Sequence, residues 1–177
     1  MQPALLIASP QMKDPFFERA LVLVWHHDED GAIGVIVNRP LDHTLPNVLD
    51  LPGDIDLSSY SDTHVAWGGP VSTDSGTVVT REPVPDGEGW NLEGIGVSRS
   101  MDVLVHLLTH QHPVLLCLGY AGWGPGQLDA EIEQGGWLLT DPDPAIVFEA
   151  PADERYDRAL ASLGLTASMV WMQPIDE

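Results

Sequence analysis

Residues 20–40, ALVLVWHHDEDGAIGVIVNRP, decide the fold class. The stretch contains two runs rich in Val and Ile, residues 20–25 and 33–37, separated by a polar segment that ends in Gly31. Runs of this kind are typical of β-strands, and a polar turn that ends in glycine joins them as a hairpin. Pro40 ends the second strand, because proline cannot donate to the strand ladder. The sequence therefore predicts an antiparallel strand pair near its start.

Short apolar runs on both sides of this hairpin predict further strands, at residues 5–8, 65–67, 77–80, 114–118, 137–139 and 146–148. Cap residues and glycine stops predict helices after Thr44, from Ser98 or Ser100 to about His110, from Gln127 to Gly135 and from Ala152 to Gly164. The second of these helices carries an apolar face of Met101, Leu104, Val105 and Leu108. Strands outnumber helices without regular βαβ alternation. We therefore predict an α+β fold, with a mixed, mostly antiparallel sheet that is curled toward a small barrel and flanked by helices.

Length and composition favour a single domain over residues 1–177. A chain of this size buries roughly 70% of its unfolded surface and needs no disulfide to fold. Cys117, the only cysteine, lies in an apolar run and is predicted to be a buried, unreactive thiol. No basic leader precedes the first strand, and no apolar run approaches 18 residues. We expect a cytoplasmic protein without a membrane span.

The charge balance limits the partners of this chain. Seven Lys and Arg residues face 27 Asp and Glu residues, which gives a formal net charge of −20. Binding to nucleic acid depends on cations that neutralise phosphates, and these few cations form no basic patch. The sequence therefore argues against direct DNA or RNA contact and against an anionic membrane surface.

The glycine-rich stretch from Gly119 to Gly126 follows a predicted strand and precedes a predicted helix. Phosphate-binding loops occupy such a place, because helix N-terminal amides attract anions. The stretch lacks the Lys-Ser/Thr pair of a P-loop and the spacing of a dinucleotide fingerprint. A tight turn that needs glycine for its backbone is the favoured interpretation, and a small anionic or planar ligand against Tyr120 or Trp123 is the alternative.

Two other groups of residues suggest catalysis or metal binding. Ser98 lies in a near match to the nucleophile elbow, but the final glycine is missing and a helix cap is favoured. His106, His110 and His112 have a spacing that could bind zinc, yet the first two lie opposite the apolar face, which favours a solvated surface. The adjacent pair at residues 26–27 points to opposite faces of a strand and does not easily share a metal.

Four blocks of sequence resemble one known family, and the resemblance covers nearly the whole chain. The blocks are residues 14–19, 27–40, 68–71 and 119–128. In this order they resemble the AlgH/YqgE family, which implies a compact α+β fold with a barrel-like sheet and a bacterial cytoplasmic protein. The resemblance also implies a transcriptional-regulator label without an agreed biochemical activity or a DNA-binding motif. Members often carry a cysteine where this chain has Trp25, so the resemblance does not support cysteine-dependent chemistry here.

Three of these blocks contain backbone breaks that directly follow strands, and such breaks at one edge of a sheet bring their loops together. The residues predicted to line a shared ligand cleft there are Asn38, Arg39, Gly69, Pro70, Trp123, Gln127 and Glu131. Arg39 is a rare cation that could hold a carboxylate or phosphate in its fork. The alternative is that Arg39 pairs with a carboxylate such as Asp14 or Glu131 and only braces the fold.

The sequence thus favours a non-enzymatic, cytoplasmic regulatory or binding protein without a cofactor. It would act through an unidentified protein or small-molecule partner rather than through direct DNA contact. The first alternative is a small hydrolase or metal-dependent enzyme that uses His or carboxylate residues. The second is a structural partner in a larger assembly.

Overall fold

The structure is a computed structural model that describes residues 4–51 and 53–165. Its strands are β1 Ala4–Ala8, β2 Leu21–Asp28, β3 Gly31–Ile36, β4 Pro40–Thr44, β5 His64–Trp67, β6 Val71–Thr80, β7 Trp90–Asn91, β8 Gly96–Ser98, β9 Val114–Trp123 and β10 Trp137–Thr140. Its α-helices are α1 Leu45–Val48, α2 Met101–Thr109, α3 Gln127–Glu133 and α4 Ala152–Ser162. A 3-10 turn at Ser58–Tyr60 and a π-helical turn at Ala145–Glu149 complete the elements of the described residues.

The described strands form one ten-stranded sheet in the order β10-β1-β2-β3-β9-β6-β8-β7, with β5 paired to β9 and β4 paired to β5. Every pair is antiparallel except β5 with β9, which run parallel. The predicted α+β class with a mixed, mostly antiparallel sheet is therefore confirmed. Over the residues described, β10 and β7 remain at the two ends of the strand order, so the sheet does not close into a barrel.

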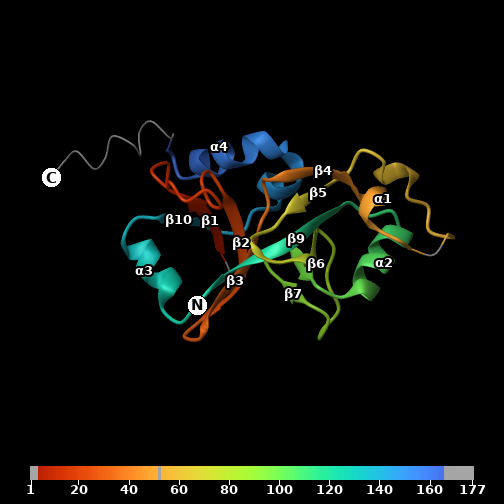
Figure 1. Cartoon of the computed structure of the whole chain (residues 1–177), viewed down its shortest axis with the longest axis horizontal. Coiled ribbons are helices and arrows are strands. Elements are labelled where there is room, and N and C mark those ends of the chain that lie inside the picture. Colours follow the sequence, from red (N-terminus) through yellow and green to blue (C-terminus); the bar gives the residue numbers. More distant parts are fainter. Residues whose placement is uncertain (1–3, 52, 166–177) are drawn as a thin grey trace.

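Strand β9 is the centre of the molecule (Figure 1). Its first half pairs with β6 on one side and β5 on the other, so that Cys117 lies opposite both Thr77 and Ala66. Its second half pairs with β3, where Trp123 lies opposite Ala32. The sheet therefore branches at β9, because the first half of this strand pairs with β5 and β6 and the second half pairs with β3.

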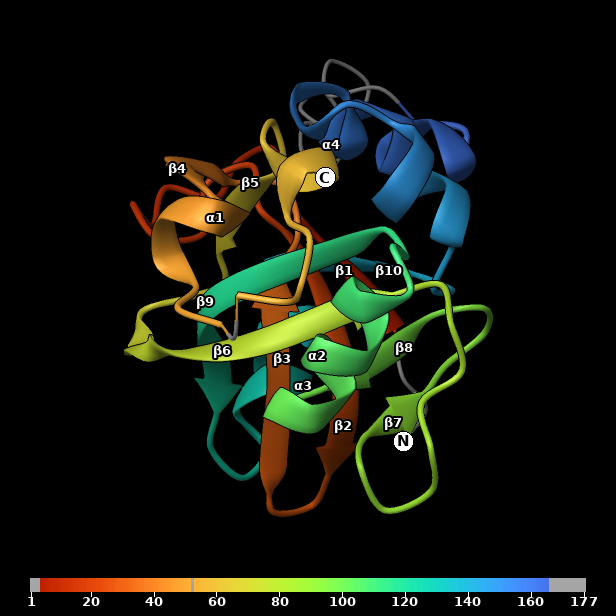
Figure 2. The ribbon, with the colours of Figure 1, turned by 90° about the vertical axis from the view of Figure 1, so that its right-hand side faces the viewer.

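Two hydrophobic cores form around this sheet. The larger core contains β1, β2 and β3 together with Tyr156 and Leu160 of α4, and the smaller core packs α2 against β6 and the start of β9. In Figure 2, α2 lies over β6 and β9, while α3 lies at the opposite end of the molecule. Each fully buried Leu or Ile stabilises the fold by roughly 1.5–3 kcal/mol. None of the helices in the described residues is long and apolar enough to cross a membrane.

The hairpin that opens the sequence analysis forms as predicted, but its strands extend further into the polar segment. β2 continues to Asp28, and the turn is reduced to residues 29–30. The register shifts between Val24 and His26, so Trp25 forms a β-bulge. As predicted, the two histidines point to opposite faces, because His26 is exposed while His27 is 8% exposed.

Two element predictions are wrong. Residues 146–148 are not a strand but part of the π-helical turn, because the Asp143 carboxylate accepts a hydrogen bond from the Ala145 amide (2.9 Å) and starts a helical turn. Periodicity cannot distinguish so short an apolar run in a strand from one in a buried helix. Residues 119–123 are not a loop but the second half of β9, since pairing with β3 overrides the turn preference of glycine.

The face of α2 is predicted only in part. Leu104 and Leu108 are buried as predicted, together with Val103 and Leu107, whereas Met101 is 58% exposed. Ser100 caps this helix as expected, and its Oγ accepts a hydrogen bond from the Val103 amide.

Candidate functional site

Three of the predicted site residues meet at the start of α3. Trp123 Nε1 and Trp137 Nε1 both donate to Glu131 Oε1, at 3.0 and 2.9 Å. Gln127 Nε2 donates to Glu131 Oε2 at 3.0 Å, so Gln127 and Glu131 face the same space, as their spacing of one helical turn predicted. The Glu131 carboxylate is therefore held in place by three donors from β9, α3 and β10.

A short turn positions this carboxylate. β9 ends at Trp123, and Gly126, with φ of 71°, takes the left-handed conformation just before α3 begins. The Gln127 side chain closes the turn, because its Oε1 accepts a hydrogen bond from the Gly124 amide at 3.0 Å. The strand, the turn and the first two turns of α3 thus bring the indole and the carboxylate together.

A pocket of about 300 Å³ adjoins this carboxylate, and we call it the Glu131 pocket. Phe17, Trp123 and Trp137 line it and pack against one another, with ring centroids 5.7–6.3 Å apart. Asp14 supplies a second carboxylate, and none of the lining residues is a lysine, arginine or histidine. The pocket therefore combines aromatic surface with negative charge.

The Asn38–Arg39 part of the predicted cleft lies elsewhere, on the other side of the turn at residues 14–19. The Arg39 guanidinium donates to the backbone carbonyls of Phe16 and Glu18 and lies 5.7 Å from the centre of the Trp67 ring. Burial lowers the pKa of Arg39, which the nearby carboxylates of Glu18 and Asp14 partly oppose. Asn38 accepts a hydrogen bond from the Leu21 amide and donates to the Arg19 carbonyl, both at 2.9 Å. Both side chains thus bind backbone in this turn, and Arg39 forms no hydrogen bond with a carboxylate in the described structure.

Gly69 and Pro70 lie beside β9 rather than in the Glu131 pocket. Gly69 has φ of 153°, and a Cβ atom there would meet the Tyr120 carbonyl carbon at 2.2 Å. Pro70 is exposed at the start of β6. Of the seven residues predicted for a shared cleft, Trp123, Gln127 and Glu131 line the Glu131 pocket, whereas Asn38, Arg39, Gly69 and Pro70 do not.

The three histidines weighed as metal ligands in the sequence, for which a solvated surface is favoured, also lie close together. The ring centroids are 4.3 Å apart for His106 and His110 and 6.3 Å apart for His110 and His112. His110 Nδ1 donates to the His106 carbonyl at 2.9 Å, and His112 Nδ1 lies 3.7 Å from Glu82 Oε2. Across residues 4–51 and 53–165, however, no three His, Cys, Asp or Glu side chains form a group that could hold a metal ion. The exposure of His106 and His110 agrees with a solvated face.

Ser98 is fully buried in β8, which decides between the two interpretations of its motif. Its Oγ donates to the Glu88 carbonyl at 2.6 Å and accepts a hydrogen bond from the Ser100 amide at 3.0 Å. A nucleophile needs a base within reach and access to a substrate. Ser98 instead joins a loop to the start of α2, and Ser100 rather than Ser98 is the cap.

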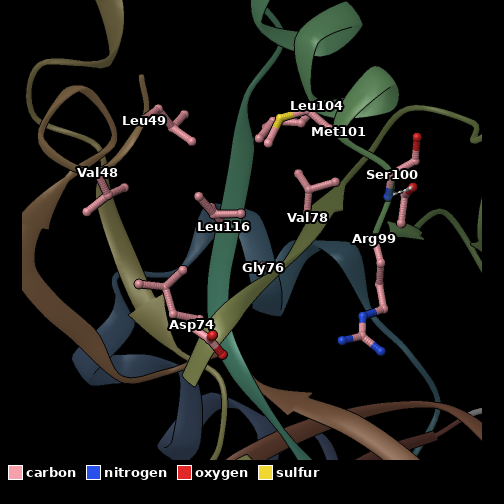
Figure 3. A pocket seen from close by; sticks show the side chains of 12 residues that line it. Val48, Leu49, Asp74, Gly76, Val78, Arg99, Ser100, Met101, Leu104 and Leu116 are labelled. Atoms are coloured by element: carbon pink, nitrogen blue, oxygen red, sulfur yellow. Dashed lines mark hydrogen bonds between the residues drawn. The ribbon is translucent and has the colours of Figure 1, made fainter. Parts of the chain in front are cut away.

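A second hollow, an apolar groove of about 280 Å³, lies between α1 and α2 (Figure 3). Val48 and Met101 stand on opposite sides of Leu116 and Val78, and they are 38% and 58% exposed. Arg99 lies at its rim. None of the residues predicted for the ligand cleft lines this groove, whereas Ser98 does.

Sequence reasoning missed two walls of the Glu131 pocket. Phe17 lies in the block of residues 14–19 and could have been found there, because that block is one of the four that carry the family resemblance. Trp137 lies only six residues after Glu131, but as the first residue of a short strand it carries no comparable signal.

Comparisons with known proteins place this chain in a family. The sequence model of the AlgH-like family matches residues 5–168. The chain belongs to the AlgH-like family. A UPF0301 protein of Burkholderia vietnamiensis is 42% identical over 175 residues, which cover 93% of this chain and 89% of the relative. A UPF0301 protein of Burkholderia ambifaria matches with the same identity and coverage.

Solved structures of AlgH-like architecture agree with this assignment. The solution structure of the AlgH protein from Pseudomonas aeruginosa superposes with a TM-score of 0.77 at 36% identity, covering 96% of this chain and 92% of that one. A crystal structure of a Corynebacterium diphtheriae protein has a TM-score of 0.74 at 22% identity and covers 96% and 90% of the two chains. The second likeness concerns the fold alone. The AlgH-like family predicted from the four sequence blocks is therefore confirmed.

Proposed function

We propose that this AlgH-like chain is a non-enzymatic binding protein that acts in the cytoplasm through a small ligand or a protein partner, without direct DNA contact. The observation that carries the proposal is the Glu131 carboxylate, held by two indole N–H groups and one amide at the wall of an aromatic pocket. A rigid polar group in a mostly apolar pocket is typical of ligand sites. The ligand site of this proposal is the Glu131 pocket.

The chemistry of the pocket favours a small organic cation. A carboxylate has about four acceptor positions, and the three donors to Glu131 leave one of them on Oε2 for a ligand N–H. The faces of Trp and Phe rings attract ammonium groups, and Asp14 adds a second negative charge. The net charge of −20 raises the local concentration of cations further.

The alternative of a small hydrolase or metal-dependent enzyme has less support. Such an enzyme would use His or carboxylate residues, and in residues 4–51 and 53–165 no three His, Cys, Asp or Glu side chains form a group that could hold a metal ion. Ser98, the residue of the near nucleophile-elbow match, is fully buried and engaged in two hydrogen bonds. The binding proposal requires no nucleophile. It uses a pocket whose carboxylate, Glu131, accepts three side-chain hydrogen bonds.

The proposal is tested by titrating the protein with tetramethylammonium, butylammonium and butane-1,4-diammonium. Tryptophan fluorescence is the measurement, because Trp123 and Trp137 line the pocket. We expect a saturable change for at least one probe, with a dissociation constant below about 10 mM. The variant Glu131→Gln keeps an oxygen acceptor for the indoles but removes the charge, and we expect it to weaken binding about tenfold or more.

Glu133→Gln is the matched control, since Glu133 lies on the same helix, is exposed and carries the same charge. Its affinity should stay within about twofold of the unchanged protein, as expected for an exposed charge away from the ligand. Equal effects of the two variants, or no saturable change with any probe, would contradict the cation site. Glu131→Ala should also lower the free energy of unfolding by about 2–4 kcal/mol, because it leaves two indole N–H groups without an acceptor.

A further inference from the structure

A second candidate site surrounds Arg155, which lies in the first turn of α4. Its guanidinium donates through Nε to the Ala150 carbonyl at 3.0 Å and through Nη1 to the Val37 carbonyl. In the described part of the chain no carboxylate pairs with Arg155, although the sequence contains 27 Asp and Glu residues. The half-buried Arg39 has the same kind of backbone-carbonyl partners, so the feature that distinguishes Arg155 is the pocket that it lines.

Three other arginines of this fold pair with carboxylates. Arg19, Arg81 and Arg158 are exposed, and each pairs with a carboxylate, at 3.4, 3.0 and 2.9 Å. Arg155 is half-buried, and burial lowers its pKa from the usual value. The guanidinium nevertheless remains charged, because its ordinary pKa lies far above neutrality. Arg155 therefore carries a half-buried positive charge whose hydrogen-bond partners in the described residues are backbone carbonyls.

Arg155 lines a pocket of about 380 Å³, which we call the Arg155 pocket. Its apolar walls include Leu115, Val147 and Phe148, and His64 of β5 is its second nitrogen-bearing side chain. No Asp or Glu is among its lining residues. The pocket is thus the reverse of the Glu131 pocket in charge, and it is formed by α4, β5 and the first half of β9 rather than by α3.

The unused donors of this pocket can be counted. The guanidinium has five N–H groups, of which two are engaged with carbonyls, so three are available. His64 donates through Nδ1 to the Leu41 carbonyl at 2.7 Å. Its Nε2 is an acceptor in the neutral ring and donates to an anion only when the ring is protonated. Asp153 and Glu154 belong to the same turn of α4 as Arg155, but both are exposed, and Glu154 pairs with Arg158.

We propose that the Arg155 pocket binds a small organic anion, a carboxylate or phosphate with an apolar body, whose anionic group pairs with the Arg155 guanidinium. The planar fork of arginine matches both anions in a bidentate arrangement. The apolar body would lie against Phe148 and Leu115. This site is independent of the Glu131 pocket, so each proposal can fail without the other.

The test is a titration of the isotope-labelled full chain with inorganic phosphate, phenyl phosphate, butyrate and butylammonium, followed by two-dimensional NMR. We expect the Arg155 Nε–H signal and the amide signals of Ala152 and Leu115 to shift with phenyl phosphate or butyrate, but not with butylammonium. Phenyl phosphate and inorganic phosphate share the anionic group, so a stronger response to the former assigns a role to the apolar walls. A stronger response to butyrate than to phenyl phosphate identifies a carboxylate site.

Variants give a second, independent measurement. Arg155→Gln should weaken binding about tenfold or more, because a charge-assisted pair is lost, and Arg158→Gln on the same helix is the matched control, expected to stay within about twofold. His64→Gln, an exposed position, should also weaken binding and serves if Arg155→Gln does not fold. Binding that is unchanged in Arg155→Gln, or in His64→Gln where Arg155→Gln does not fold, would overturn the proposal. The absence of any shift with all three anions would do the same.

Discussion

At the scale of the residue, burial determines the chemistry of Cys117. Its side chain is 0% exposed, and its sulfur lies 3.8 Å from the Ile36 carbonyl oxygen. Burial raises the pKa of this thiol from about 9 to about 12, although the nearby Arg155 guanidinium acts in the opposite direction. A thiolate is the reactive form of cysteine, and the folded protein holds almost none of it at neutral pH.

We therefore predict that thiol reagents label Cys117 about a thousandfold more slowly in the folded protein than in urea, because labelling requires local or global opening. The chain has a single cysteine, so the signal has one source. Rapid stoichiometric labelling of the folded protein at pH 8 would contradict the prediction.

The same pKa shift has a consequence for stability. The folded-state pKa lies above the unfolded value, so the unfolded chain releases its thiol proton first as the pH rises. The contribution of Cys117 to stability is complete below about pH 9 and is lost between about pH 9 and 12.

At the scale of the element, the connection between β5 and β6 depends on close backbone contacts. Gly68 donates to the Leu118 carbonyl at 2.7 Å and accepts a hydrogen bond from the Ile36 amide at 2.8 Å. Gly69 packs so closely against Tyr120 that no side chain fits between them. The two glycines thus connect the end of β3 to the middle of β9.

We predict that Gly69→Ala lowers the free energy of unfolding by about 3 kcal/mol or more, because it adds a steric clash to an unfavourable backbone conformation. Gly53→Ala is the matched control, since a Cβ atom there meets nothing within 4 Å. Its effect should stay within about 0.5 kcal/mol. Urea denaturation followed by circular dichroism measures both variants, and equal midpoints would show that the backbone contact at Gly69 is dispensable.

At the scale of the whole molecule, charge controls which partners can approach. The chain has a net charge of −20 and only six arginines and one lysine. Three of the arginines pair with carboxylates of the protein itself. Each such pair contributes little to stability when exposed, but it removes a cation from contact with phosphates.

We predict no binding to duplex DNA at about 0.15 M salt, because too few cations are available to displace counterions. Fluorescence anisotropy of a labelled duplex checks this, with a cationic peptide as the positive control on the same duplex. A salt-sensitive rise in anisotropy below about 1 µM protein would sink the prediction.

The sequence by itself determined the features that depend on residues close to one another along the chain. The first hairpin, the Ser100 cap and the shared orientation of Gln127 and Glu131 follow from periodicity and capping, and the structure contains all of them. The AlgH-like family also followed from four short blocks, and the comparisons confirm it. Residues 119–123 and 146–148 escaped such reasoning, because tertiary pairing and a helical turn overrode their local preferences.

Only the tertiary structure decided which distant residues share a pocket. The rings of Phe17 and Trp137 lie 5.7 Å apart although most of the chain separates them, and Arg155 reaches Val37 across 118 residues of sequence. The residues predicted for one cleft are separated by the tertiary structure as well. Arg39 donates to backbone carbonyls of the turn at residues 14–19 and does not line the Glu131 pocket. Strand register and helix docking depend on how much apolar surface the whole chain buries. The spacing of residues within one segment therefore cannot predict them.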